Sequence, residues 1–283
     1  MTAPATLESV RSYWNSRPCN VRHSTKPVGT KEYFDEVEAR KYRVEPHIPA
    51  FAEFPRWNGK HVLEVGCGIG TDTINFARAG ARVTAVDLSE VSLNIARQRA
   101  EVMGVADRIT FYHGSVETLC EFLPPRDRYD LIYSFGVLHH TPDPDMAMFE
   151  LVCCADTGTE FKIMVYNKWS WKVLWILLTE GLPHWLWIGW TSIADIVAKH
   201  SEAQTGCPVT YTYTRDEARH LLADWGVTVT SIAVDHIFPY SIPEYVEHQY
   251  KKVWYFRYLP AQVFRWLERQ IGWHIMIDGV FGE

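Results

Sequence analysis

The fold of this chain is decided by the stretch Val62-Leu63-Glu64-Val65-Gly66-Cys67-Gly68-Ile69-Gly70, in which an apolar strand runs into three alternate glycines. Glycine tolerates positive φ and carries no Cβ, so the main chain can turn tightly beneath a bound ligand. The helix expected after the turn offers free N–H groups and the positive end of its dipole to an anionic group. The stretch therefore predicts a ligand site where a first strand meets a first helix.

Outward from this turn, strand and helix signals alternate along the chain, which is typical of βα units in a largely parallel sheet. Strands are expected at residues 62–65, 83–86, 109–112, 130–133, 161–166, 227–234 and 274–277. Helices are expected at residues 7–16, 31–45, 71–79, 90–103, 116–122, 144–152 and, after a capping box at Thr214, as far as Trp225. This pattern predicts an α/β fold with a Rossmann-like, seven-stranded, doubly wound sheet whose last strand pairs antiparallel.

Aromatic residues are distributed unevenly along the chain. It has twelve Trp, and most of its aromatic side chains follow residue 165. We expect four segments: an N-terminal helical lid (1–58), a Rossmann-like core (59–166), an aromatic helical cap (167–210), and the end of the sheet with a second aromatic insertion (211–283). The two aromatic segments are expected to roof the ligand site, or else to pack against each other or against a partner.

A second motif ends the expected second strand, where Asp87 follows Val83-Thr84-Ala85-Val86. A carboxylate at this strand tip can accept hydrogen bonds from both hydroxyls of a ribose. The alternative is that Asp87 only caps the helix at 90–103. A dinucleotide site is disfavoured because its fingerprint is Gly-x-Gly-x-x-Gly, and here the third glycine comes one residue early.

Together, Glu64-x-Gly-x-Gly-x-Gly, Asp87 and the segment Ser134-Phe135-Gly136-Val137-Leu138-His139-His140 resemble the class I S-adenosylmethionine (SAM)-dependent methyltransferases. More narrowly, they resemble the bacterial small-molecule branch related to quinone-pathway methyltransferases. The resemblance implies SAM as cofactor, S-adenosylhomocysteine as product and a small-molecule methyl acceptor. It implies cofactor contacts from Glu64, Gly66, Cys67, Gly68, Gly70, Asp87, Leu88, Ser115, Val116, Glu117, Ser134, Phe135 and Gly136.

The methyl acceptor is not specified by these motifs, and O, N, S and C all stay open as the accepting atom. A base is needed only if that atom carries a proton that must leave, and histidine suits this task near neutral pH. His139 and His140 follow the fourth strand and are the candidate bases, although both can equally be structural. The expected substrate-side residues are Trp14, His23, Tyr33, Tyr166, Trp169 and Trp171.

Charge and cysteine usage exclude several classes of function. The net charge of −6 and the absence of a Lys/Arg-rich run disfavour nucleic acid as a partner. Six scattered cysteines without a Cys-x-x-Cys pair disfavour a disulfide framework and a zinc site, so no metal ligands are predicted. The polar N-terminus lacks a signal-peptide pattern and indicates a cytoplasmic protein. Peripheral membrane contact, a homodimer and a catalytically silent SAM-binding protein stay as alternatives.

Overall fold

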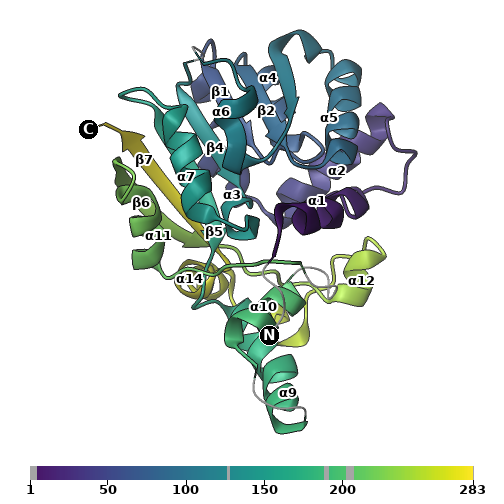
Figure 1. Ribbon diagram of the computed structural model, residues 1–283. Coiled ribbons are helices and arrows are strands. Elements are labelled where there is room, and N and C mark those ends of the chain that lie inside the picture. Colours follow the sequence, from purple (N-terminus) through teal and green to yellow (C-terminus); the bar gives the residue numbers. More distant parts are fainter. Residues whose placement is uncertain (1–4, 126–127, 188–190, 202–206, 283) are drawn as a thin grey trace.

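The computed structural model describes residues 5–125, 128–187, 191–201 and 207–282, which form one seven-stranded sheet flanked by helices (Figure 1). The strands lie in the order β3-β2-β1-β4-β5-β7-β6. They are β1 (His61–Val65), β2 (Arg82–Asp87), β3 (Ile109–His113), β4 (Leu131–Phe135), β5 (Glu160–Tyr166), β6 (Val227–Asp235) and β7 (His274–Phe281). β7 pairs antiparallel with β5 and β6, and the other pairs are parallel. The predicted α/β doubly wound sheet of seven strands is confirmed.

The strand order reverses between β1 and β4, because the chain builds outward to β3 on one side before returning to place β4 on the other. In open parallel sheets the loops at such a switch point diverge to opposite faces and leave a crevice outside the carboxyl ends of the strands. The glycine turn after β1 lies at this crevice. The topology therefore places the predicted ligand site where this fold class binds ligands.

The described helices include those predicted at 7–16, 31–45, 71–79, 90–103, 144–152 and after Thr214, together with others that were not placed individually from the sequence. The long helices are α1 (Leu7–Ser16), α2 (Lys31–Val44), α4 (Thr71–Arg78), α5 (Glu90–Val102), α7 (Pro144–Cys153), α10 (Ile193–Ser201), α11 (Arg215–Ala223) and α14 (Ala261–Ile271). The short ones are α3 (His47–Ala52), α6 (Leu119–Phe122), α8 (Trp171–Ile176), α9 (Leu182–Trp187), α12 (Ile242–Val246) and α13 (Trp254–Arg257). Tighter or wider turns are η1 (Phe54–Trp57), η2 (Ala106–Arg108), η3 (Val116–Thr118), η4 (Leu138–His140) and the π-helical η5 (Leu177–Gly181).

Two apolar cores cover the two faces of the sheet. Successive strand residues point to opposite faces, so Val62 packs with α3, α4 and α5, whereas Leu63 packs with α6, α7 and α11. Both side chains are completely buried, and burying a side chain of this size contributes about 1.5–3 kcal/mol. The two cores hold the strands rigidly and fix the positions of the loops at their carboxyl ends.

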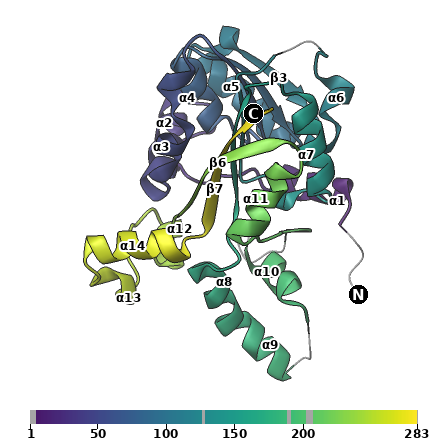
Figure 2. The same ribbon diagram turned by 90° about the vertical axis from the view of Figure 1, so that its left-hand side faces the viewer.

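The aromatic segments lie beyond one end of the sheet. Helices α8, α9 and α10 extend away from it, and α12, α13 and α14 form a second group beside them (Figures 1 and 2). Residues 188–190 and 202–206 of the predicted cap, and residues 1–4 of the predicted lid, lie outside the described part of the chain. The division into four segments stays a prediction. Within the described residues, no helix has the length and apolar character needed to cross a bilayer.

Three local predictions differ from the structure. The expected helix at 116–122 is divided into η3 and α6, and the last strand continues to Phe281 rather than ending at Ile277. Helix α3 was not predicted, because six residues that include Pro49 give too short a period to recognise. It matters here, since α3 brings His47 to the start of β7, beside the carboxyl end of β5, where His274 lies 2.9 Å from it.

Candidate active site

A cavity of about 330 Å³ opens at the switch point between β1 and β4, with α1 and the end of α2 on its other side. Its volume falls in the range of small-molecule sites, about 300–1,000 Å³. The predicted site residues that line it are Trp14, Gly66, Cys67, Gly68, Asp87, Leu88, Ser115, Val116, Phe135, Gly136, His140 and Tyr166. The predicted site residues outside its lining are His23, Tyr33, Glu64, Gly70, Glu117, Ser134, His139, Trp169 and Trp171.

The three glycines of the turn all have positive φ, but they are required for different reasons. A Cβ on Gly66 would lie 2.1 Å from Val137, and one on Gly70 would lie 3.1 Å from the Cβ of Ala96. A Cβ on Gly68 would meet nothing within 4 Å, although Gly68 is part of the cavity wall. Gly66 and Gly70 therefore serve close packing within the protein, whereas the bare main chain at Gly68 faces space that a ligand can fill.

Asp87 joins the ends of β1 and β2 at the cavity. Its two carboxylate oxygens accept hydrogen bonds from the main-chain N–H groups of Gly68 (2.7 Å) and Ser89 (2.8 Å). The helix cap itself is Ser89, so Asp87 is not the N-cap of α5. Burial raises the pKa of the Asp87 carboxyl, and the two backbone hydrogen bonds oppose that rise. Each oxygen can accept more than one hydrogen bond, so the carboxylate can also bind hydroxyls from the cavity.

Glu64 lies behind the turn rather than in the cavity wall. It is buried and accepts a hydrogen bond of 2.5 Å from the Thr73 hydroxyl on α4. Burial, followed by the charge of Asp72, raises the pKa of Glu64 to about 8. Glu64 does not line the cavity, and its hydrogen bond to Thr73 connects the end of β1 to α4 behind the glycine turn.

The loop after β3 contributes Ser115 and Val116 to the cavity. The Ser115 hydroxyl accepts a hydrogen bond from the main-chain N–H of Glu117 and so caps η3. The Glu117 carboxylate accepts instead from the main-chain N–H of Asp143, which holds it away from the lining. This loop offers an apolar wall and a main-chain edge rather than a charged side chain.

The two candidate histidines occupy different positions. His139 is completely buried, with its ring centroid 3.6 Å from that of Tyr166, and burial lowers its pKa well below the usual value. Neither of its ring nitrogens has a hydrogen-bond partner among the described residues. His140 lines the cavity, with its ring centroid 5.3 Å from that of Trp14. The structure therefore brings His140, and not His139, to the site.

The tautomer of His140 follows from its neighbours. Its Nδ1 lies 3.0 Å from the main-chain oxygen of Val209, which can only accept a hydrogen bond. Nδ1 therefore carries the proton, and Nε2 carries the lone pair. Cys207 and Thr210 also lie near Nδ1, so the last residues of the predicted cap fix the orientation of this ring.

Four expected substrate-side residues lie elsewhere. Tyr33 is completely buried on α2 and donates its hydroxyl proton to the main-chain oxygen of Val21. The His23 ring meets the Tyr245 hydroxyl at 3.2 Å. Trp169 is 71% exposed, and Trp171 packs in the aromatic cluster of the cap. Of these four side chains, three contact other parts of the protein and Trp169 is exposed, and composition alone cannot distinguish either case from ligand contact.

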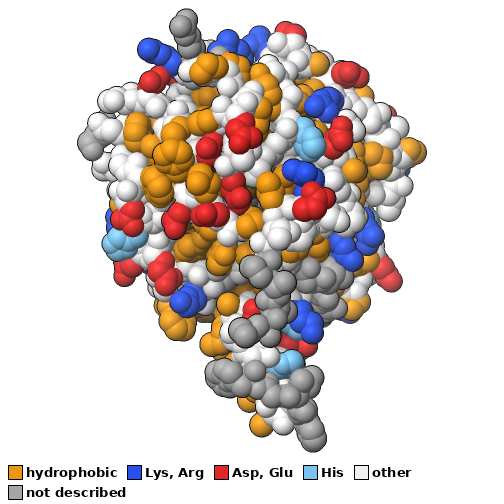
Figure 3. Space-filling model, viewed as in Figure 1, with side chains coloured by type: hydrophobic (Ala, Val, Ile, Leu, Met, Phe, Trp, Pro, Cys, Tyr) orange, Lys and Arg blue, Asp and Glu red, His pale blue; other side chains and the backbone are white. Residues whose placement is uncertain are grey.

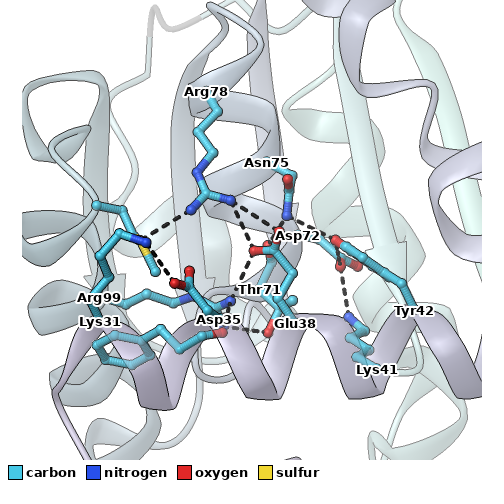
Figure 4. Close-up of polar contacts among 12 residues, drawn as sticks. Lys31, Asp35, Glu38, Lys41, Tyr42, Thr71, Asp72, Asn75, Arg78 and Arg99 are labelled. Atoms are coloured by element: carbon cyan, nitrogen blue, oxygen red, sulfur yellow. Dashed lines mark hydrogen bonds and ion pairs between the residues drawn. The ribbon is translucent and has the colours of Figure 1, made fainter.

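Among the lining residues that the sequence analysis did not predict, three carry a charged or imidazole side chain: Lys41, Glu45 and His274. They come from the end of α2 and the start of β7, and no motif connects them along the chain. Lys41 forms an ion pair of 2.7 Å with Asp72, which also accepts hydrogen bonds from the hydroxyls of Tyr42 and Tyr133. This buried network ties the end of α2 to α4 (Figure 4).

The middle of α2 is tied down as well. Glu38 pairs with Arg78 at 3.0 Å and with the completely buried Arg99 at 3.2 Å (Figure 4). Arg99 also donates to the Thr71 hydroxyl and to the main-chain oxygen of Phe34. Breaking one partner of a buried ion pair costs about 3–5 kcal/mol, so α2 is part of the rigid body of the site. Helix α1 has a single buried residue, Val10, and is the less anchored wall.

Comparison with known proteins agrees with this geometry. Residues 62–154 match the model of the methyltransferase domain family. The ubiquinone biosynthesis O-methyltransferase of Proteus mirabilis is 32% identical over 126 residues, which is 44% of this chain and 49% of that protein. The enzyme of the same name from Alkalilimnicola ehrlichii is 29% identical over 59% of this chain and 73% of its own length. The chain spans 30%, 49% and 39% of the first three curated relatives that it matches.

Solved structures share the fold across nearly the whole chain. Magnesium protoporphyrin IX methyltransferase from Synechocystis PCC 6803, with bound S-adenosylhomocysteine, has a TM-score of 0.61 at 18% identity and covers 98% of this chain and 100% of its own. Geranyl diphosphate C-methyltransferase from Streptomyces coelicolor has a TM-score of 0.57 at 19% identity, covering 98% and 99%. The fold class is confirmed, and the matched domain family and these relatives agree with the resemblance to class I SAM-dependent methyltransferases.

Proposed function

We propose that this chain transfers the methyl group of SAM to a small aromatic or apolar acceptor, with a hydroxyl oxygen as the accepting atom. The observation that carries the proposal is one cavity that joins the bare main chain of Gly68 and the Asp87 carboxylate to an aromatic wall with His140. Oxygen is preferred because several curated relatives are named ubiquinone biosynthesis O-methyltransferases.

The cofactor half of the cavity presents groups that can bind each part of SAM. Asp87 would accept hydrogen bonds from the ribose hydroxyls, and the main chain at Cys67 and Gly68 would lie against the methionine part. Leu88 and Val116 supply apolar surface for the adenine ring. SAM, when bound, supplies a methyl group activated by the positive charge on sulfur.

The other half of the cavity aligns the acceptor and excludes water. Trp14, Phe135 and Tyr166 surround this part with aromatic surface, which suits a flat or apolar molecule. The unprotonated nitrogen of His140, Nε2, would take the hydroxyl proton as the oxygen becomes methylated. The remaining work is alignment, because a methyl transfer needs the accepting atom in line with the bond that breaks.

The experiment is a screen with SAM labelled in its methyl group, offered with hydroxylated aromatic compounds and then with a bacterial small-molecule extract. We expect label in an organic-soluble product, and a loss of about 10²–10⁴-fold in kcat for His140→Ala with SAM affinity within a few-fold. Tight SAM binding without any labelled product would favour a catalytically silent SAM-binding protein instead.

Contact with a membrane surface or with a second copy is a separate proposal for the aromatic segments. Trp254 and Tyr258 are 77% and 80% exposed, and Trp266 on α14 is 59% exposed. On the face in Figure 3, hydrophobic side chains are interspersed with acidic and basic ones. Sedimentation with anionic vesicles and light scattering of the protein alone would separate the two partners.

A further inference from the structure

We propose that Glu45, His47 and His274 form a binding site for a divalent transition-metal ion such as Zn²⁺ at the floor of the cavity. One ligand atom from each residue can be chosen so that the three lie within 4.8 Å of one another. Two imidazoles and one carboxylate are a ligand set that Zn²⁺ and Fe²⁺ both accept. The proposal rests on this geometry and does not depend on methyl transfer.

The three residues come from separate elements that the fold brings together. Glu45 follows α2, His47 begins α3, and His274 begins β7. The Nε2 atom of His47 lies 2.9 Å from the Nδ1 atom of His274, and the Nε2 atom of His274 lies 3.8 Å from a Glu45 oxygen. Both imidazoles are buried, at 6% and 4% exposure. Such a convergence of buried ligands from distant parts of the chain is unusual for groups that serve packing alone.

The hydrogen bonding of this cluster is incomplete without an added group. A neutral imidazole offers one donor and one acceptor, and the contact between His47 and His274 uses one nitrogen of each. The Nδ1 atom of His47 is buried and has no hydrogen-bond partner among the described residues. Buried polar atoms are rarely left unpaired, since the loss costs about 1–3 kcal/mol. The cluster therefore contains a buried polar atom whose partner the described residues do not supply.

Neighbouring aromatic rings hold the His274 imidazole in place. His236 stacks on His274 with ring centroids 4.7 Å apart, and Phe135 meets the same ring edge to face. The cluster therefore includes a ligand whose orientation is fixed by packing.

The cluster is also open on one side. Glu45 and His274 line the cavity, whereas His47 lies behind them. An ion held by these residues would have three protein ligands and at least one position directed at the cavity. Three ligands and an open position distinguish a site that binds a further molecule from a closed structural site, which uses four.

The test is calorimetry of the full chain, stripped with a chelator and titrated with ZnCl₂ and, separately, CoCl₂, without SAM or acceptor. We expect one ion per chain, with affinity reduced about 100-fold or more in His47→Ala and His274→Ala and about 10-fold or more in Glu45→Gln. His220→Ala is the matched control, because His220 lies on the exposed face of α11 and bonds to its own helix. It should bind metal as the wild type does.

Circular dichroism of each stripped variant separates a lost ligand from a lost fold, and Glu45→Gln keeps the test valid if either histidine variant unfolds. The Co²⁺ complex supplies a second readout, since its visible absorption should change in all three variants and not in His220→Ala. Stoichiometric binding that all three variants retain, or no binding by the wild type, would overturn the proposal. Neither result bears on SAM binding, which is measured separately.

Discussion

The sharpest prediction concerns the space in front of Gly68. A Gly→Ala substitution adds a single methyl group there, and the same substitution at another glycine serves as a matched control. Gly68 has φ of +54°, and Gly104, in the turn after α5, has φ of +70°. An added Cβ meets nothing within 4 Å at either position, but only Gly68 belongs to the cavity wall. Gly68→Ala and Gly104→Ala therefore share their backbone strain and differ in what the methyl group faces.

Backbone strain should lower the unfolding free energy of both variants by the same amount. A non-glycine residue in the left-handed region costs about 1–2 kcal/mol, so urea titration should show both variants destabilised by this much. The affinity for S-adenosylhomocysteine should diverge, because the new methyl group in Gly68→Ala keeps the ligand away from the main chain. We expect at least a tenfold loss, about 1.4 kcal/mol, for Gly68→Ala and no change for Gly104→Ala, by calorimetry. Equal affinities in the two variants would refute the assignment of this cavity wall to the cofactor.

Four further predictions follow from the same contacts. Asp87→Ala should weaken S-adenosylhomocysteine binding by about 1–3 kcal/mol, measured by calorimetry, and unchanged affinity would remove the ribose role. His139→Ala should lower the unfolding free energy by about 1–3 kcal/mol in urea but leave the pH profile of kcat unaltered, whereas a changed profile would make His139 a base. Exchange of amide hydrogens should slow in α1, and not in the anchored α2, when S-adenosylhomocysteine is added. Equal slowing in both helices would mean that the mobile lid includes α2, as the predicted segment 1–58 does. Because the Glu64 pKa is raised to about 8, the folded state holds its proton more tightly than the unfolded state, so stability should fall as the pH rises from about 5 to 8. In Glu64→Gln, the decrease in unfolding free energy between these two pH values, measured by urea titration, should be mostly absent. An unchanged decrease would mean that other groups cause the pH dependence.

The core of the fold was predictable because its signals are local. Val62, Leu63 and Val65 place apolar side chains on both faces, as in a strand buried in a parallel sheet, and the glycines after them mark the turn that a ligand site needs. The helix from Thr214 is confirmed together with its capping box, in which Thr214 and Glu217 exchange hydrogen bonds. In each case a few neighbouring residues contain the whole physical reason for the structure.

The acceptor side was less predictable because its residues meet only through the fold. His274 reaches the cavity because β7 pairs antiparallel with β5, in a register that sets it opposite Tyr166. The antiparallel pairing of this last strand was predicted, but nothing in the neighbouring sequence reports its register. Aromatic composition was a poor guide for the same reason, since Tyr166 lines the cavity while Trp169, only three residues later, is exposed to solvent. Side-chain direction after a strand ends is decided by the following loop.

A crystal structure of the full chain grown with S-adenosylhomocysteine tests the central claim most directly. We expect the ligand in the cavity between β1 and β4, with its ribose hydroxyls on the Asp87 carboxylate and its methionine part against Gly68. The sulfur should face the wall formed by Phe135, Tyr166 and His140. S-adenosylhomocysteine bound at another surface, or an empty cavity at a saturating concentration of the ligand, would contradict the account.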